Sequence, residues 1–257
     1  MRHRTLLERE LMATSSPVKP DYGVDAPNVL RNLFLFGALC VLLVFITPRV
    51  WHLGHVDFTL HPMFAGTGGL LLVEAALFLL YVKSGKFRHR DFMLSLHPWR
   101  GDEQVLDVGC GRGLLLAGAA KRLTTGHATG LDIWSNVDMG GNSEAATLHN
   151  LELEGVASRC TLVSAGAQEM PFADASFDVI VSNLCLHNIY DRPTRLQALH
   201  QIARVLKPGG IALISDYKRT GEYAAELRKA GLNVNLRWGN WLTTFPPLRI
   251  VIARKPG

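Results

Sequence analysis

The sequence predicts an α/β protein with a mainly parallel sheet, preceded by two apolar helices. Three observations lead to this fold class. Apolar strand patterns alternate with helix patterns from residue 104 to the C-terminus, as crossover connections between parallel strands require. One strand runs directly into a glycine-rich turn and a helix, at residues 104–123. Upstream, residues 33–47 carry no charge and residues 63–82 carry only Glu74, so both stretches favour apolar helices.

The turn after the first strand is the best candidate for a ligand site. The strand, residues 105–108, and a run of helix formers from residue 114 enclose glycines at positions 109, 111 and 113. Open α/β sheets bind nucleotide-like cofactors at such a junction. The compressed glycine spacing and Asp107 differ from the dinucleotide fingerprint, whose glycines approach a pyrophosphate. Because a carboxylate repels a pyrophosphate and attracts cations, the turn favours a ligand with positive groups, such as a sulfonium and an ammonium.

Further strands and helices follow in alternation. A strand at residues 128–134 contains Asp132, and an acidic residue here can accept hydrogen bonds from both ribose hydroxyls. We expect later strands at residues 161–164, 177–183, 211–215, 233–237 and 249–253. We expect helices at residues 114–123 and 222–230, one capped by Asn142 or Ser143 that ends near Glu154, and one from Pro193 to a stop at residues 207–210. The ligand is expected at the C-terminal ends of the parallel strands.

The two apolar stretches predict a membrane hairpin. With its flanking residues the first approaches the roughly 20 residues that span a bilayer, and the second follows after a short connection. Basic residues precede the first helix and follow the second, whereas the connection has only Arg49, so the positive-inside rule predicts that both termini and the α/β domain are cytoplasmic. A pair of buried helices on a soluble domain is the alternative. Glu74 is costly against lipid, so we expect it to face the partner helix, to be protonated or to line a substrate site.

These features divide the chain into three parts. Residues 1–28 are polar and are expected to form a mostly disordered tail. Residues 29–90 contain the hairpin and a basic linker, residues 83–90, which is expected to lie along an anionic leaflet. Residues 91–257 form the α/β domain, which begins with a short helix over residues 91–96.

The distribution of charge argues against a nucleic-acid partner. The net charge is +5, but residues 1–100 hold 11 basic against 7 acidic side chains, and the remainder holds 16 against 15. The basic excess therefore lies away from the α/β domain, whereas a duplex-binding protein needs a basic face that neutralises phosphates.

Cysteines and histidines give no metal signature. The cysteines at positions 40, 110, 160 and 185 lack paired metal spacing and fit a reducing compartment. Cys110 and Cys185 lie near the expected cofactor site and are expected to be small buried fillers rather than ligands of a soft metalloid. Three histidines in the hairpin connection match no standard metal pattern beside Asp57, so no metal is expected; they are His52, His55 and His61.

Four collinear segments resemble class I S-adenosylmethionine-dependent methyltransferases. They are residues 105–113 (VLDVGCGRG), 130–134 (GLDIW), 170–181 (MPFADASFDVIV) and 205–210 (VLKPGG). The likeness covers residues 91–217 and is closest to the small-molecule branch that includes ubiquinone- and menaquinone-type methyltransferases. It implies a doubly wound, Rossmann-like sheet of seven strands whose last strand is antiparallel. It also implies S-adenosyl-L-methionine as cofactor and a small-molecule acceptor.

The resemblance assigns cofactor-binding roles to particular residues. Asp107 and the turn, with Gly109, Cys110, Gly111 and Gly113, would hold the methionine moiety. Asp132 would bind the ribose and Ile133 would lie beside the adenine, with Trp134 as a further neighbour. Asn183 and Leu184 would lie next to the methyl donor. Similar proteins often carry an aspartate for the adenine amino group where this chain has Gly166, and Ala167 or Gln168 is expected to substitute for it.

Methyl transfer requires alignment of a nucleophile with the sulfonium and, for oxygen or nitrogen nucleophiles, a base. His187 is the leading candidate base, with Asn188 and Tyr190 as orienting groups, although a purely structural histidine is an open alternative. Weaker candidates are Asp216, Tyr217 and Asp138. The sequence therefore predicts a membrane-anchored methyltransferase for a small, lipophilic acceptor, of unknown oligomeric state. The alternatives are a non-catalytic membrane protein that binds a partner, and a Rossmann dehydrogenase, which Asp107 and the glycine spacing oppose.

Overall fold

A seven-stranded sheet organises the C-terminal part of the chain. The computed structural model describes residues 18–135, 140–241 and 243–257. The strand order is β5-β4-β3-β6-β7-β9-β8, and β9 is antiparallel to both of its neighbours while β3 to β7 are parallel. The expected sheet, including its antiparallel last strand, is confirmed. The strands are β3 (Gln104–Val108), β4 (His127–Asp132), β5 (Cys160–Ser164), β6 (Phe177–Asn183), β7 (Leu206–Asp216), β8 (Asn233–Trp238) and β9 (Arg249–Arg254).

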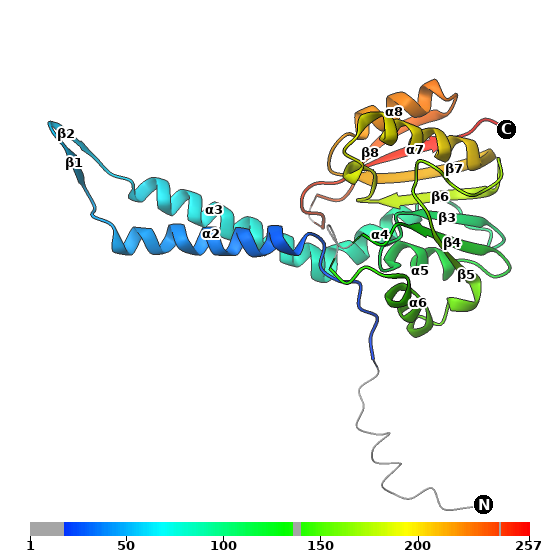
Figure 1. The fold of residues 1–257 in the computed structure, drawn as a ribbon, viewed down its shortest axis with the longest axis horizontal. Coiled ribbons are helices and arrows are strands. Elements are labelled where there is room, and N and C mark those ends of the chain that lie inside the picture. The colour runs from blue at the N-terminus through cyan, green and yellow to red at the C-terminus, as the bar shows by residue number, and fades with distance from the viewer. Residues whose placement is uncertain (1–17, 136–139, 242) are drawn as a thin grey trace, which may run out of the picture.

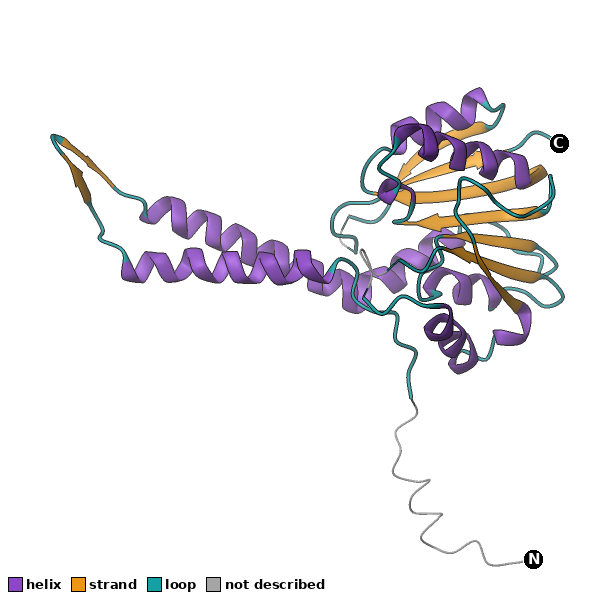
Figure 2. Ribbon diagram, in the orientation of Figure 1, coloured by secondary structure: helices purple, strands orange, loops and turns teal. Residues whose placement is uncertain are grey.

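Helices cover both faces of this sheet (Figure 2). On one face α4 (Lys86–Leu94), α5 (Leu114–Ala120) and α6 (Glu144–Leu153) pack on Val105 and Val179. On the other, α7 (Arg192–Val205) and α8 (Thr220–Lys229) pack on Leu106 and Ile180. Successive strand residues point to opposite faces, so the apolar residues of one strand contribute to two cores, as Val105 does on one face and Leu106 and Val108 do on the other. Full burial of each such side chain stabilises the fold by about 1.5–3 kcal/mol. Short 3₁₀ turns complete the domain: η2 (Ala157–Arg159) and η3 (Leu186–Asn188).

Two long helices project from the α/β domain as an antiparallel rod (Figure 1). They are α2 (Pro27–Ile46) and α3 (His61–Leu80), and each is long and apolar enough to cross a membrane. Their 20 residues correspond to about 30 Å, the thickness of a bilayer core. Large apolar side chains face outward, including Phe45, which is 80% exposed, and Leu70, which is 60% exposed. Such exposure contradicts the alternative of two helices buried on a soluble domain.

Glycines set the close approach of α2 and α3. A Cβ on Gly68 would lie 3.1 Å from the carbonyl oxygen of Gly37 and 3.0 Å from Val41 Cγ2, whereas Gly69 faces open space. Small residues at such a crossing let two helix backbones pack without intervening side chains, as in membrane helix pairs. Glu74 is half-buried on α3. The connection, expected as a plain loop, contains a two-stranded hairpin of β1 (Trp51–Leu53) and β2 (Val56–Phe58) at the far end of the rod.

The expected linker at residues 83–90 is wrong, because α3 continues into the α/β domain. A five-residue π-helical turn, η1 (Tyr81–Gly85), joins α3 to α4, so the short helix expected at residues 91–96 begins at Lys86 instead. One π turn advances the helix by an extra residue and changes which side chains share a face. Tyr81 and Lys86 thereby point to the same side, where Arg90 and Met93 follow one and two turns later. The linker at residues 83–90 was predicted because a helix with several basic residues has the same composition as a connecting loop.

Part of the expected disordered tail is ordered. Residues 1–17 lie outside the described part of the chain, but residues 18–26 run across the α/β domain before α2 begins. Tyr22 is buried and its hydroxyl donates to Glu154 Oε1 at 2.6 Å. The Asp21 main chain exchanges hydrogen bonds of 2.9 and 2.8 Å with the Asn150 side chain. We call residues 18–26 the N-terminal strap. Polar composition did not prevent ordering, because α6 supplies partners for the strap backbone.

The remaining boundaries follow the expected pattern with one shift. Helix α7 ends at Val205, and β7 begins at Leu206, five residues before the expected strand. The Pro-Gly-Gly run therefore lies within β7, and the pairing of β6 with β7 changes register between Phe177 and Val179. Ser143, one of the two expected caps of α6, accepts a hydrogen bond from the main-chain N–H of Ala146 at 3.2 Å.

Candidate functional site

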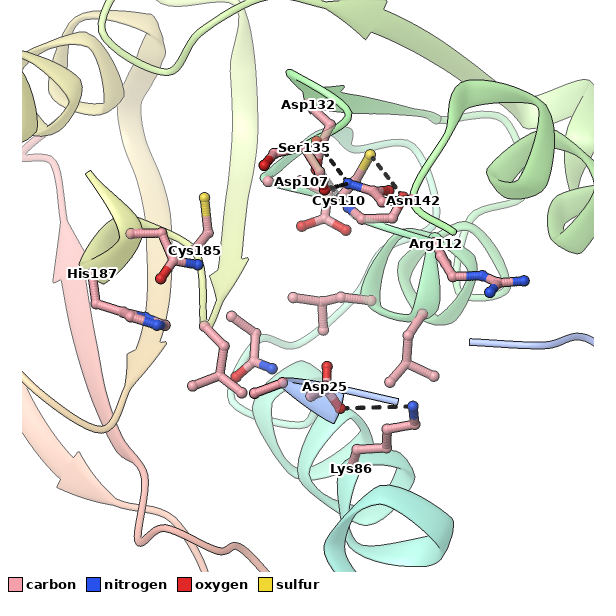
Figure 3. A pocket seen from close by; sticks show the side chains of 18 of the residues that line it. Asp25, Lys86, Asp107, Cys110, Arg112, Asp132, Ser135, Asn142, Cys185 and His187 are labelled. Carbon is pink, nitrogen blue, oxygen red and sulfur yellow. Dashed lines mark hydrogen bonds and ion pairs between the residues drawn. The ribbon is translucent and has the colours of Figure 1, made fainter. Parts of the chain in front are cut away.

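A cavity of about 710 Å³ lies where the carboxyl ends of β3, β4 and β6 meet the base of the rod. Figure 3 shows Asp107 and Asp132 on one side of it, Asp25 and Lys86 on the opposite side, and His187 and Cys185 on a third. Parallel strands that end at one edge bring side chains from distant parts of the chain together. Of the residues expected to hold the cofactor or to act as the base, Gly113 and Trp134 do not line this cavity; those that line it are Asp107, Gly109, Cys110, Gly111, Asp132, Ile133, Ala167, Gln168, Asn183, Leu184 and His187.

Gly113 has a different position. It adopts a left-handed φ of +83° at the start of α5, and a Cβ there would lie 3.0 Å from Thr147 Cγ2. It therefore allows α5 to begin and α6 to pack behind the turn. Gly109, at φ +72°, faces the cavity edge, where a Cβ would overlap the Cys185 sulfur. The Gly109 N–H donates to the Leu131 carbonyl at 2.7 Å, which ties the turn to the end of β4.

Cys110 and Cys185 are neutral thiols packed around the turn. Cys110 is buried, and desolvation raises the pKa of both thiols well above the ordinary value. Neighbouring carboxylates raise these pKa values further. A thiol that stays protonated is a poor nucleophile and a poor metal ligand. Their arrangement is that of small apolar fillers.

Asp107 is a buried carboxyl group that lacks a full set of partners. It is 1% exposed, accepts a hydrogen bond from the Leu116 main chain, and its Oδ2 has no partner among the described residues. Burial, followed by the charge of Asp132, raises the pKa of Asp107 to about 8. A buried oxygen of this kind is costly until something donates to it. A cationic ligand in the cavity would supply that donor and would favour the ionised form.

Asp132, at the end of β4, is held in place by main-chain donors. Its Oδ2 accepts from the Gly111 N–H at 2.8 Å, and its Oδ1 accepts from the Trp134 N–H at 2.7 Å and from Asn142 Nδ2 at 3.2 Å. A carboxylate has about four acceptor sites, so capacity remains for a hydroxyl from the cavity. The Oδ1 of Asn142, a second lining residue, is buried without a partner in the described chain.

Gly166 stands where similar proteins often carry an aspartate for the adenine amino group, and the side chain of Gln168 occupies the space beside it. A Cβ on Gly166 would lie 2.5 Å from Gln168 Nε2 and 2.6 Å from its Oε1, so the carboxamide occupies the volume next to Gly166. Gly166, Ala167 and Gln168 all line the cavity. A carboxamide offers both a donor and an acceptor, which suits an aminopurine edge. The glycine is therefore what allows the glutamine to fold back over the loop.

We expect Gln168→Ala to weaken S-adenosylmethionine binding about fivefold, because one hydrogen bond of about 1 kcal/mol is lost. Isothermal titration calorimetry on the detergent-solubilised full chain checks this. Gln104→Ala is the matched control, since Gln104 is exposed at the opposite end of β3. Equal affinity of Gln168→Ala and wild type would exclude a role for the carboxamide.

Asn183 connects the end of β6 to the first turns of the rod. Its side chain interacts with the Tyr81 hydroxyl and with the His89 ring, and His89 Nε2 lies 2.7 Å from Ser215 Oγ. The Asn183 Oδ1 has no partner among the described residues and the side chain lines the cavity. Asn183 thus presents a free acceptor next to Leu184, which adopts a left-handed φ of +53° and packs against the rod base.

His187 forms a pair with Asp216 at the cavity wall. The His187 Nδ1 lies 2.9 Å from Asp216 Oδ1, and the side chains are 11% and 0% exposed. The Asp216 carboxylate also accepts from the main-chain N–H of His187 and Tyr217 and from the Tyr223 hydroxyl, at 3.2, 2.8 and 3.1 Å. The imidazole therefore lies beside a carboxylate, although its Nδ1 forms no hydrogen bond of good geometry with any described residue. Asn188 and Tyr190, expected to orient it, both line the cavity, and Tyr190 is 72% exposed.

Two of the three weaker candidate bases, Tyr217 and Asp216, lie beside His187. The Tyr217 ring meets the His187 ring edge-on at 4.8 Å between centroids, and both residues line the cavity. Asp216, expected as a weaker candidate base, is buried, accepts three hydrogen bonds and does not line the cavity. Asp138, the third such candidate, lies outside the described residues.

The strap and α4 form the opposite wall, which the sequence did not predict. Lys86 is 5% exposed, donates to the carbonyl oxygens of Tyr22 and Gly23 at 3.1 and 2.6 Å, and lies 3.7 Å from Asp25 Oδ2. Burial raises the pKa of Asp25. Arg112, inside the glycine-rich turn, pairs with Asp21 at 2.9 Å. The strap is thus tied to both the turn and α4, and it covers the cavity from that side (Figure 3).

Sequence reasoning missed these wall residues for identifiable reasons. Lys86 and Arg90 were grouped with a basic linker expected to lie along an anionic leaflet, and Tyr22 and Asp25 with a mostly disordered tail. Asn142 was considered only as a helix cap. One signal was available: Tyr22 is the only aromatic residue between positions 1 and 33, and an isolated aromatic residue in a polar segment often marks a packing contact.

Residues 106–214 match a protein family described as "Methyltransferase domain". A sterol 4-C-methyltransferase of Caenorhabditis elegans is 35% identical over 118 residues, which are 46% of this chain and 32% of that protein. A demethylmenaquinone methyltransferase of Staphylococcus aureus is 35% identical over 111 residues, 43% of this chain and 41% of that protein. The chain therefore spans less than half the length of these curated relatives.

Solved structures share the fold. An S-adenosylmethionine-dependent methyltransferase from Aquifex aeolicus superposes with a TM-score of 0.51 at 20% identity, covering 64% of this chain and 88% of that one. At this identity the similarity concerns the fold.

Proposed function

Because this chain contains a class I S-adenosylmethionine-dependent methyltransferase domain, we propose that it is a membrane-anchored enzyme that methylates a small, lipophilic acceptor. One observation carries the proposal: a single cavity joins the carboxylate-lined glycine turn to the apolar base of a rod that is long enough to cross a bilayer. The relatives named for sterol and demethylmenaquinone substrates support an acceptor of low polarity.

The donor set of the cavity fits S-adenosylmethionine. Buried oxygens without hydrogen-bond partners in the described chain lie on four residues that line the cavity: Asp25, Asp107, Asn142 and Asn183. The ammonium and sulfonium groups suit Asp107, the ribose hydroxyls suit Asp132, and the carboxylate suits Arg90 or Arg112 on the cavity wall. When bound, the cofactor supplies an electrophilic methyl group. Ile133 and Gln168 would border the adenine.

The residues of the chain perform three tasks in this reaction. The glycine turn and Asp132 hold the cofactor, Asn183 and Leu184 border the reacting centre, and the strap excludes water from the opposite side. His187, held by Asp216, accepts the proton of an acceptor hydroxyl, and the neighbouring carboxylate stabilises the resulting imidazolium. Alignment and exclusion of water supply most of the acceleration, because methyl transfer needs no covalent enzyme intermediate.

The rod provides the membrane anchor. Its outward-facing leucine and phenylalanine side chains would be costly in water and favourable in hydrocarbon. Basic residues flank the ends of the rod that join the α/β domain, so the positive-inside rule supports a cytoplasmic domain with the β1–β2 tip on the far side. An acceptor dissolved in the bilayer would then reach the cavity without crossing water.

Cysteine accessibility tests this topology in intact cells. We expect His55→Cys, at the tip between β1 and β2, to react with a membrane-impermeant maleimide added outside. Lys19→Cys, on the strap, should react only after permeabilisation. Both substitutions are made in a chain whose four cysteines are replaced by serine. Equal labelling of both sites from outside would contradict the topology.

The enzymatic proposal is tested with the full chain in lipid nanodiscs. We expect calorimetry to detect S-adenosylmethionine binding, and a lipid extract incubated with the methyl-labelled cofactor to yield labelled product identified by mass spectrometry. Binding without any labelled product from lipid or soluble extracts would favour the non-catalytic alternative. Failure to bind the cofactor would overturn the proposal.

A further inference from the structure

The base of the rod carries a second hollow that adjoins the cavity. It has a volume of about 310 Å³ and is lined by Val29, Asn32, Leu33 and Phe36 of α2 and by Leu71 of α3. Val29 and Leu33 also line the main cavity. The two spaces therefore share a wall, and the second extends the first along the rod, away from the α/β domain.

The hollow follows one face of α2. Residues 29, 33 and 36 recur at helical spacing, which places them on a single stripe. Between Val29 and Phe36 this stripe is about 10 Å long at 1.5 Å per residue. Four of the five lining side chains are apolar, and Val29 and Phe36 are 52% and 58% exposed, so the stripe is open to the surroundings of the rod.

The residues that line the combined space differ between its two ends. Asp107 and Asp132 lie at the glycine turn, whereas Leu33, Phe78 and Phe245 lie at the rod, where the Asp25–Lys86 pair is the polar exception. A molecule that suits this arrangement has a polar, ionisable head and an unbranched or slender apolar tail. A compact apolar molecule would fill the middle and leave the hollow on α2 unused.

We propose that the α2 hollow is a binding site for the tail of the acceptor, which is an amphiphile with a hydroxylated head and a long apolar chain that enters sideways from the bilayer. This inference rests on the proposed function, because the head must reach the reacting centre. The chain lies along Val29, Leu33 and Phe36, and the hydroxyl faces His187. Burial of the chain stabilises the complex by about 0.8 kcal/mol per methylene group, so affinity increases with chain length up to the end of the stripe.

Photolabelling with chains of graded length tests the site. The probes are para-alkylphenols with butyl, octyl and hexadecyl chains, each carrying a diazirine at the chain end, added to the full chain in nanodiscs. We expect the butyl probe to label the shared wall at Val29 or Leu33 and the octyl probe to label Phe36 or Leu71. The hexadecyl probe should label residues of the rod beyond Phe36. Labelling without this order, or equal labelling by alkanes that lack the phenol, would overturn the proposal.

Two tryptophan substitutions on α2 test the proposed tail site: one fills the hollow, and the other leaves it open. Leu33→Trp fills the shared wall, whereas Leu39→Trp places the same side chain on an outward position of α2 that is 48% exposed and lines neither space. We expect Leu33→Trp to reduce octyl-probe labelling of Phe36 at least tenfold and Leu39→Trp to leave it unchanged. Equal labelling of the two variants would contradict the proposal.

Calorimetry separates this inference from the proposed function. S-Adenosylmethionine binding should be the same in Leu39→Trp and wild type, and the far-UV circular dichroism of both variants should match that of wild type, which shows that each is folded. If ordered labelling occurs without cofactor binding, the tail site stands and the enzymatic proposal fails. If the cofactor binds and labelling has no order, the enzymatic proposal stands and the tail site fails.

Discussion

Replacement of Asp107 by asparagine should weaken S-adenosylmethionine binding by about a hundredfold and stabilise the cofactor-free protein. The carboxyl group is buried with one unpartnered oxygen, so its charge is unfavourable until a cation binds. Loss of one partner from a buried charged pair costs about 2–5 kcal/mol, which sets the expected loss of affinity. The same substitution removes the cost of ionising the group in the free protein. Affinity and stability therefore change in opposite directions.

The pH dependence of both quantities provides a second signature. The folded pKa of Asp107, about 8, lies above the model-peptide value of 3.8, so the folded protein binds more protons than the unfolded chain between these pH values. Its contribution to the free energy of unfolding is therefore greatest below about pH 4 and is lost as the pH rises through about 8. Cofactor affinity should rise over the upper part of this window, by up to about tenfold per pH unit, as the carboxyl group ionises.

Thermal unfolding and calorimetry between about pH 5 and pH 9 measure these two effects. In Asp107→Asn, the free energy of unfolding and the cofactor affinity should both depend less steeply on pH. The apparent melting temperature of this variant at about pH 8 should exceed that of wild type by a few degrees. Asp102→Asn is the control, because Asp102 is an exposed carboxylate near the other end of β3. Unchanged affinity in Asp107→Asn would show that the carboxylate does not contact the cationic part of the cofactor.

Removal of the imidazole in His187→Gln should lower the rate of methyl transfer by about 10²–10⁴-fold, as is typical when a general base is lost. Cofactor affinity should change less than threefold, because none of the cofactor contacts assigned above involves the His187 side chain. Asp216→Asn should give a loss of similar direction, because the asparagine orients the imidazole without stabilising its charged form. Single-turnover transfer into the lipid acceptor identified by the labelling assay measures both variants.

His200→Gln is the matched control for this experiment. His200 Nε2 lies 2.9 Å from Glu226 Oε1, a histidine–carboxylate pair of similar geometry on the surface between α7 and α8, outside the cavity. This variant should retain the wild-type rate. If His187→Gln also retains it, the histidine is structural and the acceptor either needs no base or uses another group.

Much of the α/β domain followed from local sequence patterns. Strand β6 was expected at residues 177–183 and is found there, because its β-branched apolar centre, residues 179–181, suits a buried strand between turn residues. The glycine turn was also predictable, since Gly109 and Gly113 adopt φ angles of +72° and +83° that other residues rarely accept. The boundary between α7 and β7 was less certain, because the Pro-Gly-Gly run fits the end of a helix as well as an irregular strand start.

Residues that share the cavity wall from distant parts of the chain were only partly predictable. His187 was predicted from its position just after β6. Asp216 is 29 residues further along the chain and meets His187 only because β6 and β7 are neighbours in the sheet. The strap and α4 gave no motif at all. Their polar and basic residues look solvated in the sequence, and each becomes a buried partner only when the other is in place, as with Lys86 and the carbonyl oxygens of Tyr22 and Gly23.

The sequence alone determined what depends on neighbouring residues: the alternation of strands and helices, the glycine turn beside Asp107, and two helices apolar enough for a membrane. Periodicity and backbone preference act over a few residues, so they can be read directly from the chain. The tertiary structure decided what depends on contacts between distant segments: the partner of His187, the fold of Gln168 over Gly166, and the continuous helix that brings the rod to the cavity. Burial and charge pairing create those features, and neither exists until the chain has folded.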